Sequence, residues 1–240
     1  MSGELTLPLA ALTGYLLGSL SGARIIGRFA APGRDLSRTR VTLDGTGESV
    51  VTVGVSSSML LARAGERAGL AAAAIDILKA FAPAMAAHLL WPDGPEDVLA
   101  AAGAVIGHVL PVYHRFAGGF GMSPLMGGLL AIDWPSLPVT VGVGAVVGIA
   151  LGSAYLATDA WPILVIPWFA WRGDMWGLGL ALLANGLYWW KSAAEALGAA
   201  RAWRKDQRPW KRRIADLKRY PDYSPPEEDG PPAPAGPIGG

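Results

Sequence analysis

The stretch LAAAAIDILKAFAPAMAAHLL, from Leu70 to Leu90, decides the fold class of this 240-residue chain. It is about twenty residues long, enough to cross a bilayer as a helix, and its only charged residues are Asp76 and Lys79. Charged side chains are scarce from Gly69 to Ser192, and most of them stand where apolar runs end. This distribution is typical of a polytopic membrane protein. The sequence therefore predicts an all-α bundle of membrane helices.

About seven apolar runs follow one another along the chain. Two of them are too short to cross a membrane alone, and we expect these to be half-helices or tilted pieces buried against neighbours. Tryptophans gather near the ends of the runs, as in an interfacial aromatic belt. The predicted spans are Leu5–Ala23, Leu70–Leu90, Val98–Val112, Leu125–Ile132, Leu137–Ala157, Trp161–Trp171 and Trp176–Ala196.

Lysine and arginine set the expected orientation. They are frequent in residues 24–67 and 201–219, whereas the loops near 93–97 and at 133 contain none. Because cytoplasmic loops carry the excess of basic residues, we expect the N-terminus outside the cell. The first long loop, the segment 106–124 and the C-terminus are then cytoplasmic.

The predicted organisation is a membrane bundle over residues 1–200 with a cytoplasmic loop at 28–68. A basic cytoplasmic tail follows at 201–219, and its charges are expected to contact anionic lipid heads. Nucleic acid is not expected as a partner, because this tail is attached directly to a membrane span. The end of the chain, residues 220–240, is rich in proline, glycine and acid, and we expect it to be disordered.

The composition excludes several kinds of site. The chain has no cysteine, which rules out disulfides, thiolate metal sites and cysteine nucleophiles. Its three histidines show no spacing such as HExxH, so no metal site is expected.

The segment Ile106–Pro124, IGHVLPVYHRFAGGFGMSP, joins an apolar helix to a glycine-rich turn. The turn contains Gly118, Gly119 and Gly121, and Ser123 follows it. Glycines let the backbone approach a ligand closely, and a turn that opens on a helix N-terminus presents N–H groups to an anion. The turn could therefore bind a phosphate. On the glycines alone, a tight turn between two membrane helices is the favoured interpretation.

Three further side chains could carry chemistry inside the bundle. Asp76 and Lys79 are three residues apart, so they share a helix face and can pair; the pair is either a functional polar site or an ion pair near the cytoplasmic end. His108 lies near the inner end of the third span. It could act as a general base, or bind an anion when protonated, or simply hydrogen-bond a neighbouring helix.

The long inside loop offers a second phosphate-binding candidate. Gly45, Thr46 and Gly47 are small or hydroxyl-bearing, Thr52 follows, and Arg38 lies just upstream. Such residues can donate hydrogen bonds to phosphate oxygens. The alternative is a solvated loop on the cytoplasmic surface.

Together these segments resemble the bacterial acyl-phosphate:glycerol-3-phosphate acyltransferase family, the PlsY type. Asp76-Ile-Leu-Lys79 resembles the family's DxxK element, and Gly107-His108 to Gly121 resembles its GHxFPvfxxFxGGKG stretch. Ser153 is similar to a serine of the fifth helix. Phe120 stands where the family has the lysine of GGKG.

The resemblance implies a multi-pass protein of the bacterial cell membrane without a cofactor. Glycerol 3-phosphate or a related acceptor would attack the carbonyl of an acyl phosphate at the cytoplasmic face, releasing phosphate and a lysophosphatidic acid. His108 and Ser153 would be catalytic. An inactive paralogue that binds lipid or a partner protein is the alternative, and a small transporter using Asp76 and Lys79 is a third. The phosphate-binding candidates are Arg38, Gly45, Thr46, Gly47, Thr52, Lys79, Gly118, Gly119, Gly121 and Ser123.

Overall fold

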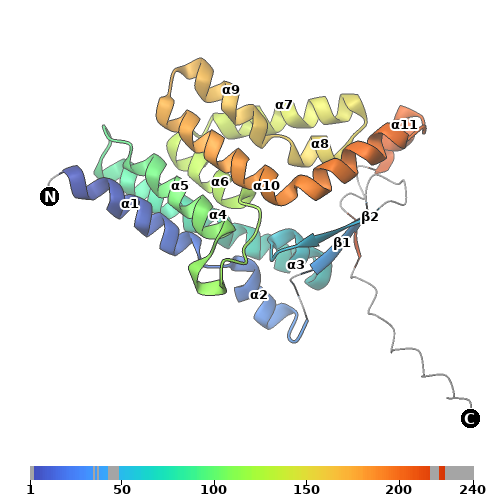
Figure 1. Cartoon of the computed structure of the whole chain (residues 1–240), viewed down its shortest axis with the longest axis horizontal. Coiled ribbons are helices and arrows are strands. Elements are labelled where there is room, and N and C mark those ends of the chain that lie inside the picture. Colours follow the sequence, from blue (N-terminus) through green and yellow to red (C-terminus); the bar gives the residue numbers. More distant parts are fainter. Residues whose placement is uncertain (1–2, 35, 37, 43–48, 217–221, 225–240) are drawn as a thin grey trace, which may run out of the picture.

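The computed structural model of the chain describes residues 3–34, 36, 38–42, 49–216 and 222–224. Helices dominate it, and most of them belong to one bundle (Figure 1). The helices are α1 Gly3–Gly18, α2 Gly22–Ala30, α3 Ser57–Ala64, α4 Glu66–Leu90, α5 Glu96–Val109, the 3-10 turn η1 Val112–His114, α6 Met122–Ile132, α7 Ser136–Leu151, α8 Ala154–Asp159, α9 Pro162–Arg172, α10 Met175–Lys205 and α11 Trp210–Asp216.

Helix α5 is the centre of the bundle. It packs against α1, α4, α6 and α10, while α9 packs on α10 and α8 on α7. Figure 1 shows α1, α4 and α5 running alongside one another, with α7 to α10 on the other side. The core between them contains Val105, Leu129 and Phe169, each 0% exposed. Burial of α5 on several sides fixes the position of the residues at its C-terminal end, where the candidate site lies.

Glycines let α1 and α5 approach each other closely. A Cβ atom added at Gly103 would lie 2.1 Å from the carbonyl oxygen of Ala11, and one at Gly14 would lie 2.0 Å from that of Ala100. Small residues at helix crossings are the usual means of close packing between membrane helices. The two helices therefore meet backbone to backbone.

Gly103→Ala is expected to destabilise the bundle, because the new methyl group must push α1 away from α5. Overpacking of this kind costs about 1–3 kcal/mol, which thermal unfolding of the purified protein in detergent would detect as a lowered melting temperature. Gly142→Ala is the matched control, since a Cβ atom there meets nothing within 4 Å. Equal melting temperatures for the two variants would contradict the close packing.

By length and apolarity, three helical segments of the described residues could cross a membrane: Leu5–Ala30, Glu66–Leu90 and Glu96–His114. Helices α6 and α7 are apolar but shorter. The predicted span Leu70–Leu90 lies within α4, whereas the first predicted span is broken, because α1 ends at Gly18 and Ser21 caps a new helix, α2. The number of seven spans and the orientation stay predictions.

A small sheet departs from the all-α prediction. The strands are β1 Arg38–Thr42, β2 Ser49–Val53 and β3 Asp222–Ser224, in the antiparallel order β2-β1-β3. Part of the segment 220–240, which was expected to be disordered, thus forms β3 and pairs with β1 of the long loop. The other residues of the segment 220–240 lie outside the described ones. The loop at 28–68 also contains α3, and the basic tail begins as the last turn of α10 and continues into α11.

Candidate functional site

A buried triad of Asp76, Lys79 and His108 links α4 to the end of α5. The Lys79 Nζ atom lies 2.8 Å from Asp76 Oδ1 and 2.9 Å from His108 Nδ1, and it also donates to the carbonyl of Leu20. An ammonium group has three N–H donors, and these contacts use all of them. Lys79 is therefore held inside the protein with its ammonium group against the His108 ring, and its role in phosphate binding stays a prediction.

The triad fixes the protonation of the His108 ring. Lysine is only a donor, so His108 Nδ1 must accept, and the proton of a neutral ring is then on Nε2. Asp76 Oδ1 is 3.6 Å from Nδ1, too far for a hydrogen bond, and an imidazolium would place two cations 2.9 Å apart. His108 thus presents an N–H donor on its free edge. This geometry disagrees with a general base and fits a donor to an anion.

The glycine-rich turn packs directly onto His108. Gly119 N donates to the carbonyl of His108 at 3.1 Å, and a Cβ atom at Gly119 would lie 2.2 Å from His108 Nε2. A Cβ atom at Gly118 would lie 2.0 Å from the His108 carbonyl oxygen. Arg115 and Phe116, just before the turn, have positive φ angles of 52° and 61°, which non-glycine residues rarely adopt. The glycines are thus needed for contact with His108.

Two cations, of which Lys191 was not among the predicted residues, donate to backbone carbonyls of this turn. Lys191 on α10 donates to the carbonyls of Gly118 at 2.8 Å and Val109 at 3.4 Å, and Arg24 on α2 donates to that of Ala117 at 3.0 Å. The turn therefore has positive charge beside it although Phe120 replaces the expected lysine. A lysine inside an apolar run such as that of α10 costs free energy to place in a membrane. The position of Lys191 could therefore have identified it as a functional candidate from the sequence.

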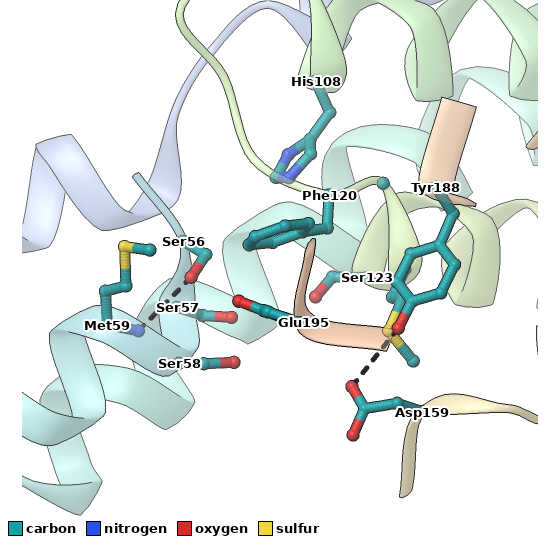
Figure 2. Close-up of a pocket in the computed structure, with 12 residues that line it drawn as sticks. Ser56, Ser57, Ser58, Met59, His108, Phe120, Ser123, Asp159, Tyr188 and Glu195 are labelled. Atoms are coloured by element: carbon teal, nitrogen blue, oxygen red, sulfur yellow. Dashed lines mark hydrogen bonds between the residues drawn. The ribbon is translucent and has the colours of Figure 1, made fainter. Parts of the chain in front are cut away.

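A small cavity of about 70 Å³ lies in front of His108 and the turn (Figure 2). Two helices begin at it: Ser56, Ser57 and Ser58 stand at the N-terminus of α3, and Gly121 to Ser123 begin α6. No side chain caps the start of α6 among the described residues. Helix N-termini favour anions, and the serine hydroxyls and His108 line the same cavity.

The lining of the cavity also includes acidic and aromatic side chains. Phe120, Tyr188, Asp159 and Glu195 line it, and Figure 2 draws the Phe120 ring between His108 and the Glu195 carboxylate. Asp159 accepts from Thr158 and lies 3.5 Å from the Tyr188 hydroxyl. None of the described residues that line the cavity is a lysine or arginine. The lining therefore combines hydroxyl groups and helix N-termini with two carboxyl groups.

Ser153 lies away from this cavity. Ser153 is the N-cap of α8, where its hydroxyl accepts from Leu156 N at 3.3 Å, and it lines a different groove beside α10. Arg38 and Thr52 lie on β1 and β2. Gly45, Thr46 and Gly47 lie outside the described residues.

Ser56, Ser57 and Ser58 were not predicted. A run of serines before an apolar helix is an N-cap signal, and Ser56 does cap α3 by accepting from Met59 N. This signal could have located the end of the inside loop that enters the site.

Asp159→Asn is expected to stabilise the protein at neutral pH. Burial raises the pKa of the Asp159 carboxyl to about 6 from 3.8, so the folded state holds a proton more tightly than the unfolded state. Wild-type stability then falls as pH rises from about 4 to 6, by up to about 3 kcal/mol. Thermal melts at pH 4 and pH 7.5 would test this: the variant should gain over wild type only at the higher pH. An equal gain at both values would contradict the shifted pKa.

Comparison with known proteins decides the family. The model of the family described as glycerol-3-phosphate acyltransferase matches residues 8–197. The chain belongs to this family. A glycerol-3-phosphate acyltransferase of Methylorubrum extorquens (strain PA1) is 34% identical over 194 residues, covering 77% of this chain and 84% of the relative. One of Pseudomonas entomophila (strain L48) is 28% identical over 179 residues, covering 75% and 88%.

Solved structures agree on the fold of this family member. The chain is similar to crystal structures of PlsY (YgiH), an integral membrane glycerol 3-phosphate acyltransferase. The lysophosphatidic acid form has a TM-score of 0.66 and 19% identity, with 87% of this chain and 98% of the other covered. The glycerol 3-phosphate form also has a TM-score of 0.66, with 21% identity and coverages of 86% and 97%. The resemblance stated from the motifs is thereby confirmed.

Proposed function

We propose that this family member is a membrane acyltransferase that moves an acyl chain from an acyl phosphate to the hydroxyl of a small acceptor of the glycerol 3-phosphate type. The main support is that two helix N-termini, serine hydroxyls and the Nε2–H group of His108 meet at one cavity. Such donors would bind the phosphate of the donor substrate and stabilise negative charge that develops during transfer.

In this proposal the reaction takes place at the cytoplasmic face of a seven-span protein in the bacterial cell membrane, with the N-terminus outside. The cavity has room for a small head group and not for an acyl chain, since one water needs about 10–15 Å³. The acyl chain has a separate place. An apolar groove of about 580 Å³ between α2 and η1 is lined by Leu20, Ile25 and Phe29, and Arg24 lies both in this groove and against the turn.

The test is acyl transfer by the purified chain in lipid nanodiscs, supplied with a long-chain acyl phosphate and several hydroxyl acceptors. We expect phosphate release together with an acylated product, which mass spectrometry would identify. Ser57→Ala with Ser58→Ala should raise the KM for acyl phosphate, because both residues line the cavity and their hydroxyls can donate to phosphate oxygens. Release of no phosphate with any acceptor would support instead a non-catalytic relative that binds lipid.

A further inference from the structure

The chain continues beyond the part that matches its family. The family match ends at residue 197, whereas α10 runs on to Lys205 and is followed by α11. We call residues 198–240 the C-terminal extension. Figure 1 shows α11 beyond the end of α10, beside the ends of α7 and α8. None of the described residues that line the cavity in front of His108 belongs to the extension. An effect of the extension on the reaction must therefore pass through other elements.

A compact turn between α10 and α11 gives the extension a defined shape. Asp206, the C-cap of α10, is 8% exposed and accepts from the Arg208 guanidinium at 2.9 and 2.8 Å. The Arg213 Nε atom lies 3.5 Å from the same carboxylate and donates to the Arg208 carbonyl at 3.1 Å. Bidentate contacts between arginine and a carboxylate have a defined geometry. The turn therefore sets the direction in which α11 leaves α10.

Two tryptophans of the extension bind the C-terminal end of α7. The Trp203 Nε1–H group donates to the carbonyl of Leu151 at 2.9 Å. The Trp210 Nε1–H group donates to the carbonyl of Ile149 at 3.0 Å. The last four carbonyls of a helix have no i+4 partner within it, so both indoles act as caps on α7. A Cβ atom at Gly152 would lie 3.4 Å from Cδ1 of Trp210. The extension thus covers the junction between α7 and α8.

Helix α8 connects this junction to the cavity. Gly152 caps the end of α7, and Ser153 caps the start of α8. Helix α8 ends at Asp159, which lines the cavity. A helix of six residues spans only about 9 Å, so a shift at its first turn also moves its last turn. His108 is held separately, on α5, by its contact with Lys79. A loosened junction would therefore displace the Asp159 part of the lining and leave His108 in place.

The extension also reaches the loop that carries the serines. Its strand β3 pairs with β1, with Tyr223 opposite Val41, and β3 packs against α3. Helix α3 begins at Ser57, which lines the cavity. The extension is thus in contact with the α7–α8 junction and with α3, and both lead to the cavity.

We propose that Trp203 and Trp210 are positioning residues for the acyl transfer. By capping α7 they hold the α7–α8 junction, and through α8 they hold the Asp159 part of the cavity lining. This inference rests on the proposed acyl transfer and adds to it a part of the chain outside the family match. Because His108 is fixed independently, loss of the two indole donors should weaken the binding of acyl phosphate more than it slows the chemical step.

Kinetics of a double variant test this role. Trp203→Phe with Trp210→Phe removes both N–H donors and keeps two aromatic rings. In lipid nanodiscs, well below the melting temperature, the KM for acyl phosphate should rise about tenfold and kcat should change by less than about twofold. Trp176→Phe with Trp190→Phe is the matched control, since both residues are exposed on α10 outside the extension, and it should keep the wild-type constants. A lowered melting temperature with unchanged KM would overturn the inference.

A distance measurement tests the positioning without any substrate. The chain has no cysteine, so Thr158→Cys on α8 and Leu61→Cys on α3, both at exposed positions, would carry the only two spin labels. Pulsed electron paramagnetic resonance should give a narrower distance distribution with the native tryptophans than with Trp203→Phe and Trp210→Phe. Identical distributions would overturn the inference whether or not transfer occurs. A widened distribution in a protein that transfers no acyl chain would refute the proposed function and leave the hold on the junction intact.

Discussion

Lys79→Met is expected to abolish most activity and to destabilise the fold by about 3–5 kcal/mol, because removal of one partner leaves the other charge buried and unpaired. Asp76 is 2% exposed and Lys79 is 7% exposed, so neither charge can turn to solvent. The variant also removes the donor that holds His108 Nδ1. Thermal unfolding and acyl-transfer assays of the same preparation would measure both effects.

A double variant separates stability from activity. Asp76→Asn with Lys79→Met removes both charges, and the amide oxygen of the new asparagine can still accept from Gly22 N, which now donates to Asp76 Oδ1 at 3.1 Å. Much of the lost stability should return, since a neutral pair needs no compensation. Activity should stay low because His108 is no longer oriented. Recovery of activity together with stability would show that the triad is structural only.

The second large effect is expected at His108. His108→Ala should lower kcat by roughly 100- to 1000-fold, the usual loss when a donor to a developing oxyanion is removed. His108→Gln keeps an N–H donor but has no basic nitrogen. We therefore expect it to retain about tenfold more activity than the alanine variant.

The pair of variants distinguishes a donor from a base. A general base needs a free lone pair, and neither glutamine nor alanine supplies a comparable one, so both variants would then lose activity equally. Melting temperatures control for folding, because His108 is also in contact with the turn through Gly119. Equal losses in two folded variants would contradict the N–H donor role.

Local spacing in the sequence predicted part of this site well. Asp76 and Lys79 were expected to share a helix face and do so, and α6 begins at Met122, directly after the glycine-rich turn. His108 was selected by its place between an apolar helix and that turn. Contacts between charged residues and glycines within about one or two helical turns of each other could be predicted from the sequence, because helix geometry alone brings such residues together.

Contacts between distant segments could not be read in this way. Asp159 at the end of α8 and Glu195 within α10 line one cavity with Ser56, which caps the start of α3. No local sequence pattern predicts that segments so far apart in the chain line the same cavity. Tyr188, Lys191 and Glu195 recur at helical spacing, a pattern that indicates a shared polar face of α10. The small sheet was missed because a membrane interpretation left the segment 28–68 as a loop.

The most direct measurement of the central claim is a structure of the protein with a non-hydrolysable acyl phosphonate. The phosphonate is expected in the cavity in front of His108, with one oxygen within hydrogen-bond distance of Nε2 and others at the serines that begin α3 or the N–H groups that begin α6. The acyl chain should extend toward apolar surface. A phosphonate bound instead in the separate groove of Arg24, Arg28 and Arg34, with the cavity empty, would contradict the account.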